Sequence, residues 1–184
     1  MNNALLLSYA FTVLMLIATP GPVVALVVNT AASAGRRRAV LTALGTHAAS
    51  LLLIGLAASL IFTSAAIDPR MLAALSLVGC LFIAYLAITS LRQALARKAD
   101  VTLSATGRGG LWQGFAMGLS NPKDIVFFVA FFPQFIQITA RTSHSLLVLA
   151  VVWLMLDLAI LGLYIQLTAK LVTPRRQRLI SLTS

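Results

Sequence analysis

Residues that commonly carry catalysis are scarce in this sequence. Its 184 residues include four acidic side chains, two histidines and one cysteine. The sequence has no metal-ligand spacing, glycine-rich phosphate loop or nucleophile elbow, and enzymes build their sites from such groups. We therefore expect a protein that is not an enzyme and that uses no metal and no cofactor. Because a nucleotide-binding motif is also missing, any transport would draw on an ion gradient instead of ATP.

Cysteine and N-terminal charge are equally sparse. Cys80 is the only cysteine, so an intramolecular disulfide is excluded. Its apolar neighbours predict a packed thiol. The first charged side chain is that of Arg36. The basic segment that opens a secretory signal peptide is therefore missing, and no signal peptide is expected.

Apolar residues dominate the composition. Only 10% of the residues are charged and 60% are hydrophobic, whereas a soluble domain has roughly 25% charged residues. The mean hydropathy is +0.97. Each of five apolar stretches is long enough for the ~20 residues that cross a bilayer. These predicted spans are residues 4–29, 39–64, 71–95, 111–137 and 145–170.

The net charge of +10 comes mainly from basic residues in the connections between the spans and near the C-terminus. Nucleic-acid binding needs a basic face on a folded surface, so this placement argues against nucleic acid as a partner. Basic connections instead mark the cytoplasmic side of a membrane protein, which places the N-terminus outside and the C-terminus in the cytoplasm. The basic clusters are Arg36, Arg37 and Arg38; Arg92, Arg97, Lys98 and Arg108; and Arg175, Arg176 and Arg178.

Proline interrupts two of the spans near their centres, at residues 19–22 (Thr-Pro-Gly-Pro) and 121–124 (Asn-Pro-Lys-Asp). Pro20 and Pro122 lie 102 residues apart, and the same shift lays the second span on the fifth. Spans paired in this way cross the membrane in opposite directions, as in inverted-repeat transporters. The prediction is an all-α, polytopic helical membrane protein with two proline-broken helices. It forms a single transmembrane domain over residues 1–184. The first repeat is about 1–97, and the second, about 111–184, is incomplete because a sixth span is missing.

A break in mid-membrane exposes backbone groups that only protein or water can satisfy. Asn121 suits an N-cap, Pro122 the first helical position and Asp124 the third, where a carboxylate can bond back to the cap. Gly21 can bend the chain before a second helix start, which would leave the amides of residues 23–25 pointing inward. Two helix starts facing one cavity would bind an anionic group such as a carboxylate. The alternative is that the prolines only kink two helices for packing.

Three ionisable side chains lie at membrane depth: Lys123, Asp124 and Asp157. A charge at mid-bilayer costs about 2.5–3.5 kcal/mol on insertion scales, so such residues usually mark an ion or substrate path. The alternative is a structural pair of Lys123 with Asp157 or with Asp124. His47, in the second span, is more simply explained as a hydrogen-bonded helix-packing residue. The candidates for carrying a coupling proton are Asp157, Asp124 and His47.

These motifs resemble the LysE/RhtB family of bacterial amino-acid exporters. The resemblance rests on the Thr-Pro-Gly-Pro break, on residues 118–123 (Gly-Leu-Ser-Asn-Pro-Lys) and on the aromatic run 127–135, and it extends from Tyr9 to about Lys170. It implies an exporter of amino acids or close derivatives in the bacterial inner membrane, driven by the proton-motive force. Family members usually have about six spans, one more than are found in this sequence. The predicted substrate-binding residues are Thr19, Pro20, Gly21, Pro22, Asn121, Pro122 and Lys123.

Two functions are therefore open. The first is secondary-active export, with an amino acid or a close derivative as substrate, the proton as coupling ion and the lipid bilayer as surroundings. The second is a non-transporting membrane protein, either truncated or dependent on a partner that supplies the sixth helix. Assembly into a homo-oligomer is compatible with both.

The charge distribution generates a testable topology. Reporter fusions after Arg38 and Arg97 should report a cytoplasmic location, and fusions after Asp68 and Arg141 an external one, because only the first two follow strongly basic connections. Alkaline phosphatase and green fluorescent protein fusions at the same four positions measure this directly. A cytoplasmic signal from the Asp68 fusion would contradict the orientation.

Overall fold

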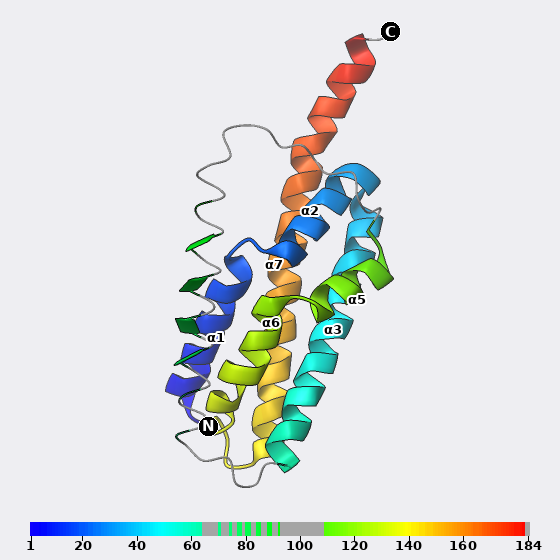
Figure 1. Cartoon of the computed structure of the whole chain (residues 1–184). Coiled ribbons are helices and arrows are strands. Elements are labelled where there is room, and N and C mark those ends of the chain that lie inside the picture. The colour runs from blue at the N-terminus through cyan, green and yellow to red at the C-terminus, as the bar shows by residue number, and fades with distance from the viewer. Residues whose placement is uncertain are drawn as a thin grey trace.

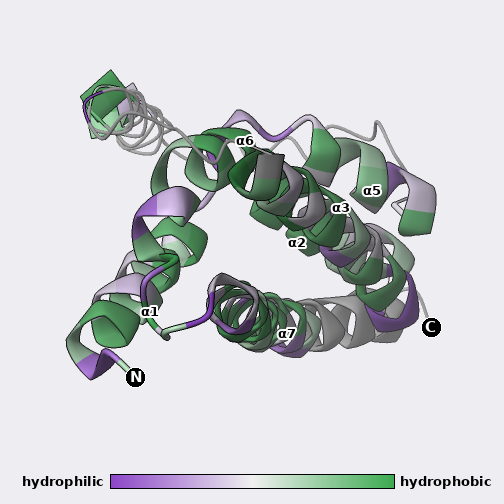
Figure 2. Cartoon of the chain, turned by 90° about the horizontal axis from the view of Figure 1, so that it is seen from below, coloured by the Kyte–Doolittle hydropathy of each residue, from purple (hydrophilic) through white to green (hydrophobic). Residues whose placement is uncertain are grey.

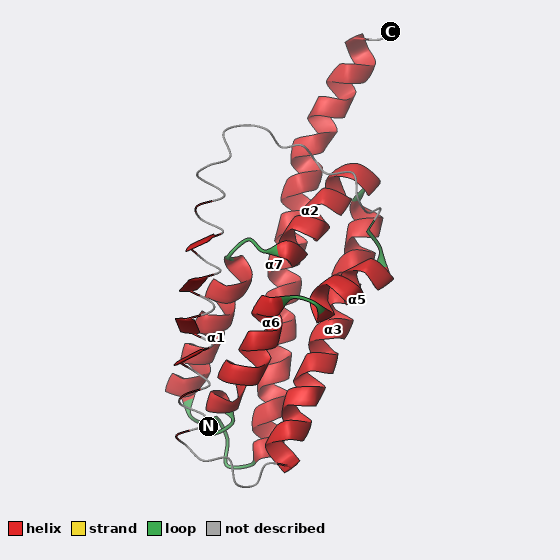
Figure 3. Cartoon of the chain, viewed as in Figure 1, coloured by secondary structure: helices red, strands yellow, loops and turns green. Residues whose placement is uncertain are grey.

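The structure is a computed structural model that describes residues 1–63 and 109–182, together with isolated positions between 70 and 92. The described part is helical, as the sequence predicts (Figure 3). Most of the predicted third span and of the loop after it lies outside the described residues. The elements are α1 (Asn3–Ala18), α2 (Pro22–Ala34), α3 (Arg36–Thr63), α5 (Leu111–Leu119), α6 (Pro122–Val126), the π-helical turn η1 (Phe127–Phe131), the 3-10 turn η2 (Phe132–Phe135) and α7 (Thr142–Leu182).

The helices form an up-and-down bundle. In Figure 1, α1 and α2 lead from one end of the bundle to the other, α3 returns, α5 and α6 run in the same direction as α3, and α7 runs back. Helices α3 and α7 are each long and apolar enough to cross a membrane, and each bent pair supplies a further span if it is counted as one. Two predicted spans are thus confirmed, and both broken spans as well if each bent pair is counted as one span, although α7 continues beyond its predicted end. The two broken spans run in opposite directions, as inverted repeats require; the repeat itself stays a prediction.

The outside of the bundle is apolar, as a bilayer requires. Figure 2 shows hydrophobic residues along most of each helix. Many large apolar side chains are exposed, and lipid tails are the solvent that suits them. Cys80 is also exposed, so the packed thiol expected from its neighbours is wrong. Examples of exposed apolar residues on four different helices are Phe11, Leu52, Leu60, Trp112, Leu147 and Met155.

The first span breaks because two prolines and a glycine follow one another. Helix α1 ends at Ala18, and α2 begins at Pro22 with an axis turned by 54°. Pro20 has no N–H to continue the α1 ladder, and Pro22 occupies the first position of α2, where a missing N–H costs nothing. Gly21 is the N-cap of α2 and has extended backbone. The predicted half-helix start at Pro22 is confirmed.

The second span breaks at Asn121 and turns by 50°. Asn121 has extended backbone, and its side-chain oxygen accepts a hydrogen bond from the amide of Lys123 at 3.3 Å, with Pro122 at the first helical position. This is the N-cap predicted from the sequence. Further along, Pro133 cannot donate to the helical ladder, and the chain passes through a π turn and a 3-10 turn before it leaves the bundle.

Aromatic side chains fill one end of the bundle. Tyr9, Phe127, Phe128 and Trp153 are buried, and the Trp153 ring lies 4.9 Å from the ring of Phe127 and 4.5 Å from that of Phe128 between centroids. The Tyr9 hydroxyl donates to the carbonyl of Leu149 at 3.0 Å, which satisfies its polar end. The cluster joins α1, η1 and α7. Trp153 and these phenylalanines are therefore packing residues of the core.

Helices α3 and α5 approach so closely that backbone meets backbone. A Cβ added to Gly114 would collide with the carbonyl group of Thr42, and one added to Gly45 would collide with that of Leu111. Small residues permit such contacts in membranes, where packing replaces the hydrophobic drive. The amide of Gly110 also donates to the Thr42 hydroxyl at 2.8 Å. The contact positions the second break, because α5 leads directly into it.

This packing predicts a specific cost for a single methyl group. Gly114→Ala should destabilise the protein by about 1–3 kcal/mol, since neither helix can move without losing the contact. Gly162→Ala is the matched control, because a Cβ there meets nothing within 4 Å; its stability should hold or rise with the better helix propensity of alanine. Thermal unfolding in detergent compares the two variants. Equal midpoints would show that the α3–α5 approach is not tight.

Candidate functional site

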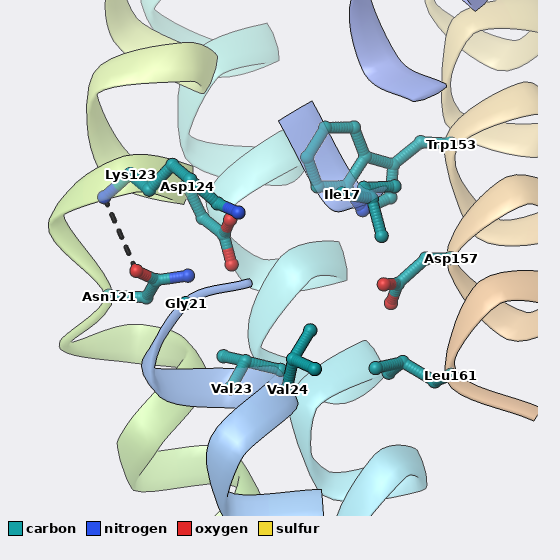
Figure 4. A pocket seen from close by; sticks show the side chains of 10 residues that line it. All are labelled: Ile17, Gly21, Val23, Val24, Asn121, Lys123, Asp124, Trp153, Asp157 and Leu161. Carbon is teal, nitrogen blue, oxygen red and sulfur yellow. Dashed lines mark hydrogen bonds between the residues drawn. The ribbon is translucent and has the colours of Figure 1, made fainter. Parts of the chain in front are cut away.

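The two helix breaks meet at one small cavity inside the bundle (Figure 4). Its volume is ≈ 20 Å³, about enough for one water molecule. In Figure 4, Asn121, Lys123 and Asp124 lie on one side, Asp157 projects from the other, and Gly21 passes between them. The lining is polar at the breaks and apolar beside them. It consists of Ile17, Gly21, Val23, Val24, Asn121, Lys123, Asp124, Trp153, Asp157 and Leu161.

Lys123 connects the two breaks. Its ammonium group donates to the carbonyl oxygens of Leu16 at 2.6 Å and of Thr19 at 3.0 Å, at the end of α1. A lysine that begins the second half-helix therefore caps the first half-helix of the other broken span. The structural pair of Lys123 with Asp124 or Asp157, weighed from the sequence, is not what the lysine forms. Its hydrogen bonds go to backbone.

Backbone geometry at the second break differs in one respect from the prediction. The amide of Asn121 donates to the carbonyl of Gly118 at 3.2 Å. The reciprocal bond of a capping box, from this amide to the Asp124 carboxylate, is thereby replaced. Asp124 is buried at 9% exposure, and its carboxyl group lines the cavity. The site therefore places a carboxyl group next to the lysine without using it as the reciprocal cap.

The first break presents fewer free amides than predicted. The amide of Ala25 donates to the carbonyl of Gly21 at 2.9 Å and so closes the first turn of α2. The amides of Val23 and Val24 have no hydrogen-bond partner within the described residues, and both residues line the cavity. A helix start leaves such donors open to an anion. Two of the three amides expected to point inward therefore remain available.

His47 and Asp157 are buried side by side across α3 and α7. The His47 Nδ1 lies 3.3 Å from a carboxylate oxygen of Asp157, and the exposure of the two residues is 6% each. The same Nδ1 lies 2.7 Å from the carbonyl of Ala43. Because a carbonyl only accepts, Nδ1 carries a proton. The other ring nitrogen, Nε2, is buried without a hydrogen-bond partner among the described residues. His47 thus packs by a hydrogen bond, as expected, and also faces the cavity's acid.

The predicted site residues take different positions around the cavity. Gly21, Asn121, Lys123, Asp124 and Asp157 line it, and His47 lies behind Asp157. Thr19 contributes its carbonyl to Lys123, while its hydroxyl bonds to its own helix. The prolines shape the backbone from outside, since the side chains of Pro20, Pro22 and Pro122 are exposed.

Sequence reasoning missed the apolar half of the lining. On α7, Trp153, Asp157 and Leu161 stand four residues apart and so share one face of the helix. That spacing around a membrane-embedded acid is a signal that points to them. Ile17, on α1, had no comparable signal because it is one apolar residue among many.

The bundle and cavity define a polytopic helical membrane protein in which two proline-broken spans enclose buried charged groups. The sequence profile of the LysE type translocator family matches residues 14–182. The chain belongs to this family, as the motifs suggested.

Relatives include proteins with and without an assigned activity. An uncharacterized membrane protein of Pseudomonas aeruginosa is 30% identical over 181 residues, which cover 94% of this chain and 84% of the relative. A leucine efflux protein of Salmonella typhimurium is 27% identical over 146 residues, covering 78% and 69% of the two chains. One of Klebsiella pneumoniae is 28% identical over 138 residues, covering 74% and 65%. No solved structure matches the chain.

The second break depends on its cap. Asn121→Ala removes the acceptor for the Lys123 amide inside the membrane, so stability should fall by about 0.5–2 kcal/mol. Asn121→Asp retains an acceptor and should lose less. Ser120→Ala is the neighbouring control, because Ser120 is exposed and its hydroxyl donates to the carbonyl of Ala116 in the preceding helix at 2.7 Å. The measurement is the unfolding midpoint in detergent. An unchanged midpoint for Asn121→Ala would show that the cap does not contribute to the stability of this span.

Proposed function

We propose that this protein is a secondary-active exporter of amino acids or close derivatives across the bacterial inner membrane. The observation that carries the proposal is the meeting of two helix breaks, about a hundred residues apart in the sequence, at one cavity that contains Lys123, Asp124 and Asp157. Paired breaks of this kind form the midplane binding sites of secondary transporters. Membership of a translocator family and the leucine efflux relatives support the same conclusion.

The cavity has the chemistry that an amino acid requires. The open amides of Val23 and Val24 and the nearby Lys123 ammonium group suit a carboxylate. The carboxyl groups of Asp124 and Asp157 and the backbone carbonyls at the end of α1 suit an ammonium group. The remaining lining is apolar, which favours a neutral aliphatic side chain such as that of leucine. We therefore propose small neutral amino acids as the first substrates to test.

Transport requires the cavity to open, because ≈ 20 Å³ does not hold an amino acid. We infer that the two broken spans move apart around the cavity when a substrate binds. Rocking of one half of an inverted-repeat transporter against the other exposes the central site alternately to each side. The breaks are suited to this motion, since each already divides its span into two half-helices with different axes.

The coupling proton is proposed to bind at Asp157, with His47 as its partner and Asp124 as the neighbouring acid. His47 and Asp157 are both buried and 3.3 Å apart, so the pair can gain or lose a proton next to the substrate. In the low dielectric of the membrane, an uncompensated charge is costly. The pair would therefore take up a proton while the empty site faces the outside, and the protonated site would return to face the cytoplasm. The pair would release this proton after a substrate binds from the cytoplasm.

The test is efflux from proteoliposomes. Purified protein should release preloaded leucine faster than protein-free vesicles, and faster still when the exterior is made acidic. Asp157→Asn should keep leucine–leucine exchange but lose the response to the pH gradient, because an amide cannot carry the proton. His47→Gln should also weaken the response of efflux to the pH gradient.

Thr168→Ala is the matched control for these variants. Thr168 lies on the same helix, and its hydroxyl donates to the carbonyl of Tyr164, one turn earlier, at 2.7 Å, so both the exchange and the pH response should persist. Absence of efflux of leucine and of a mixed amino-acid pool by the folded wild type would contradict the proposed function and favour the non-transporting alternative. Efflux that ignores the gradient in the wild type would contradict the proton coupling alone.

A further inference from the structure

The carbonyl groups of Leu16 and Thr19 are among those at the end of α1 that the helix itself cannot satisfy. In a continuous helix the carbonyl of Leu16 would accept from the amide of residue 20, but residue 20 is a proline without an N–H. The carbonyl of Thr19 would accept from Val23, but that residue belongs to the first turn of α2 beyond the break. Leu16 is buried and Thr19 is half-buried at membrane depth, where an unpaired carbonyl is costly. The sequence Thr-Pro-Gly-Pro therefore creates a pair of acceptors at a fixed place.

An ammonium group occupies this pair of acceptors. The Lys123 nitrogen lies 2.6 Å from the Leu16 oxygen and 3.0 Å from the Thr19 oxygen. These are charge-assisted hydrogen bonds at the negative end of a helix. The group lies directly beside Gly21, since a Cβ there would be in ordinary van der Waals contact with the nitrogen at 3.4 Å. The two carbonyls thus bind a primary ammonium group through its N–H donors.

We propose that the carbonyls of Leu16 and Thr19 form the subsite for the α-ammonium group of the substrate, and that Lys123 fills this subsite while no substrate is bound. The proposal rests on the function proposed above and deepens it. The open amides of Val23 and Val24 follow the same break. The α-ammonium group of an amino acid would therefore meet acceptors before the break, and its carboxylate would meet donors after the break.

The displaced lysine has other partners within reach of the cavity. Asp124 and Asp157 line the same space, and the carboxylate of the bound substrate would be a third partner. One ammonium thus replaces another at the carbonyls, and the site keeps its hydrogen bonds in both situations. Lys123 belongs to α6 and its acceptors to α1. Its departure breaks a direct connection between the two broken spans, which links substrate binding to their relative movement.

Chemical rescue tests the subsite without any assumption about transport. Lys123→Ala empties the carbonyl pair and should lower the unfolding midpoint in detergent. Ethylammonium should raise the midpoint of Lys123→Ala and leave the wild type unchanged. Tetramethylammonium, a cation without an N–H donor, should raise neither. Isopentylamine, which resembles leucine without its carboxylate, should bind Lys123→Ala at least about tenfold more tightly than the wild type, because no lysine competes. Equal effects of ethylammonium and tetramethylammonium on the variant would overturn the subsite.

A second arm uses the wild-type protein in proteoliposomes, so the proposal stays testable if Lys123→Ala does not fold. N,N,N-trimethylleucine keeps the positive charge, the carboxylate and the side chain of leucine but has no N–H to donate. Leucine should exchange for leucine, whereas the trimethylated compound should neither exchange nor compete. Exchange of trimethylleucine at the rate of leucine would overturn the subsite. If the wild type transports no amino acid at all, the proposed function fails, and the rescue arm still decides whether the carbonyls bind ammonium.

Discussion

The structure depends on satisfying the backbone at two helix breaks inside a membrane. Hydrocarbon offers no hydrogen-bond partner, so each group that a proline releases must be satisfied by the protein or by water. Lys123 supplies the partner for two carbonyls of the first break from its position in the second. Asn121 supplies the partner for the start of α6. The two breaks therefore depend on each other, and neither would be stable at this depth as an isolated kink.

Helix α3 holds this arrangement in place. On one side it contacts α5 through Gly45 and Gly114, whose missing side chains let the backbones meet. On another side it presents His47 to Asp157 of α7. The same helix thus fixes the approach to the second break and the position of the buried acid. Beyond the cavity, the aromatic cluster around Trp153 packs α1, η1 and α7 together, so any opening of the site has to occur against a well-packed end of the bundle.

Local features of the fold could be predicted from the sequence, while the cavity was predicted only in part. The N-cap at Asn121 and the helix starts at Pro22 and Pro122 follow from chemistry within a few residues, and the structure has all three. The sequence also marked Asp157 as an unusual acid. It did not indicate His47 as the partner, because 110 positions separate the two residues and their contact depends on how α3 and α7 pack.

By itself the sequence determined which segments are apolar enough to cross a membrane, where two of them break and which residue begins each second half-helix. Hydropathy, proline and capping act over short stretches of chain, so these features do not depend on distant residues. Only the tertiary structure decided the partners of the buried charges. Lys123 had two carboxylates as expected partners, yet it bonds to the carbonyls of α1, because the break places unsatisfied acceptors directly at its ammonium group. Such a choice among nearby groups depends on the relative positions of whole helices.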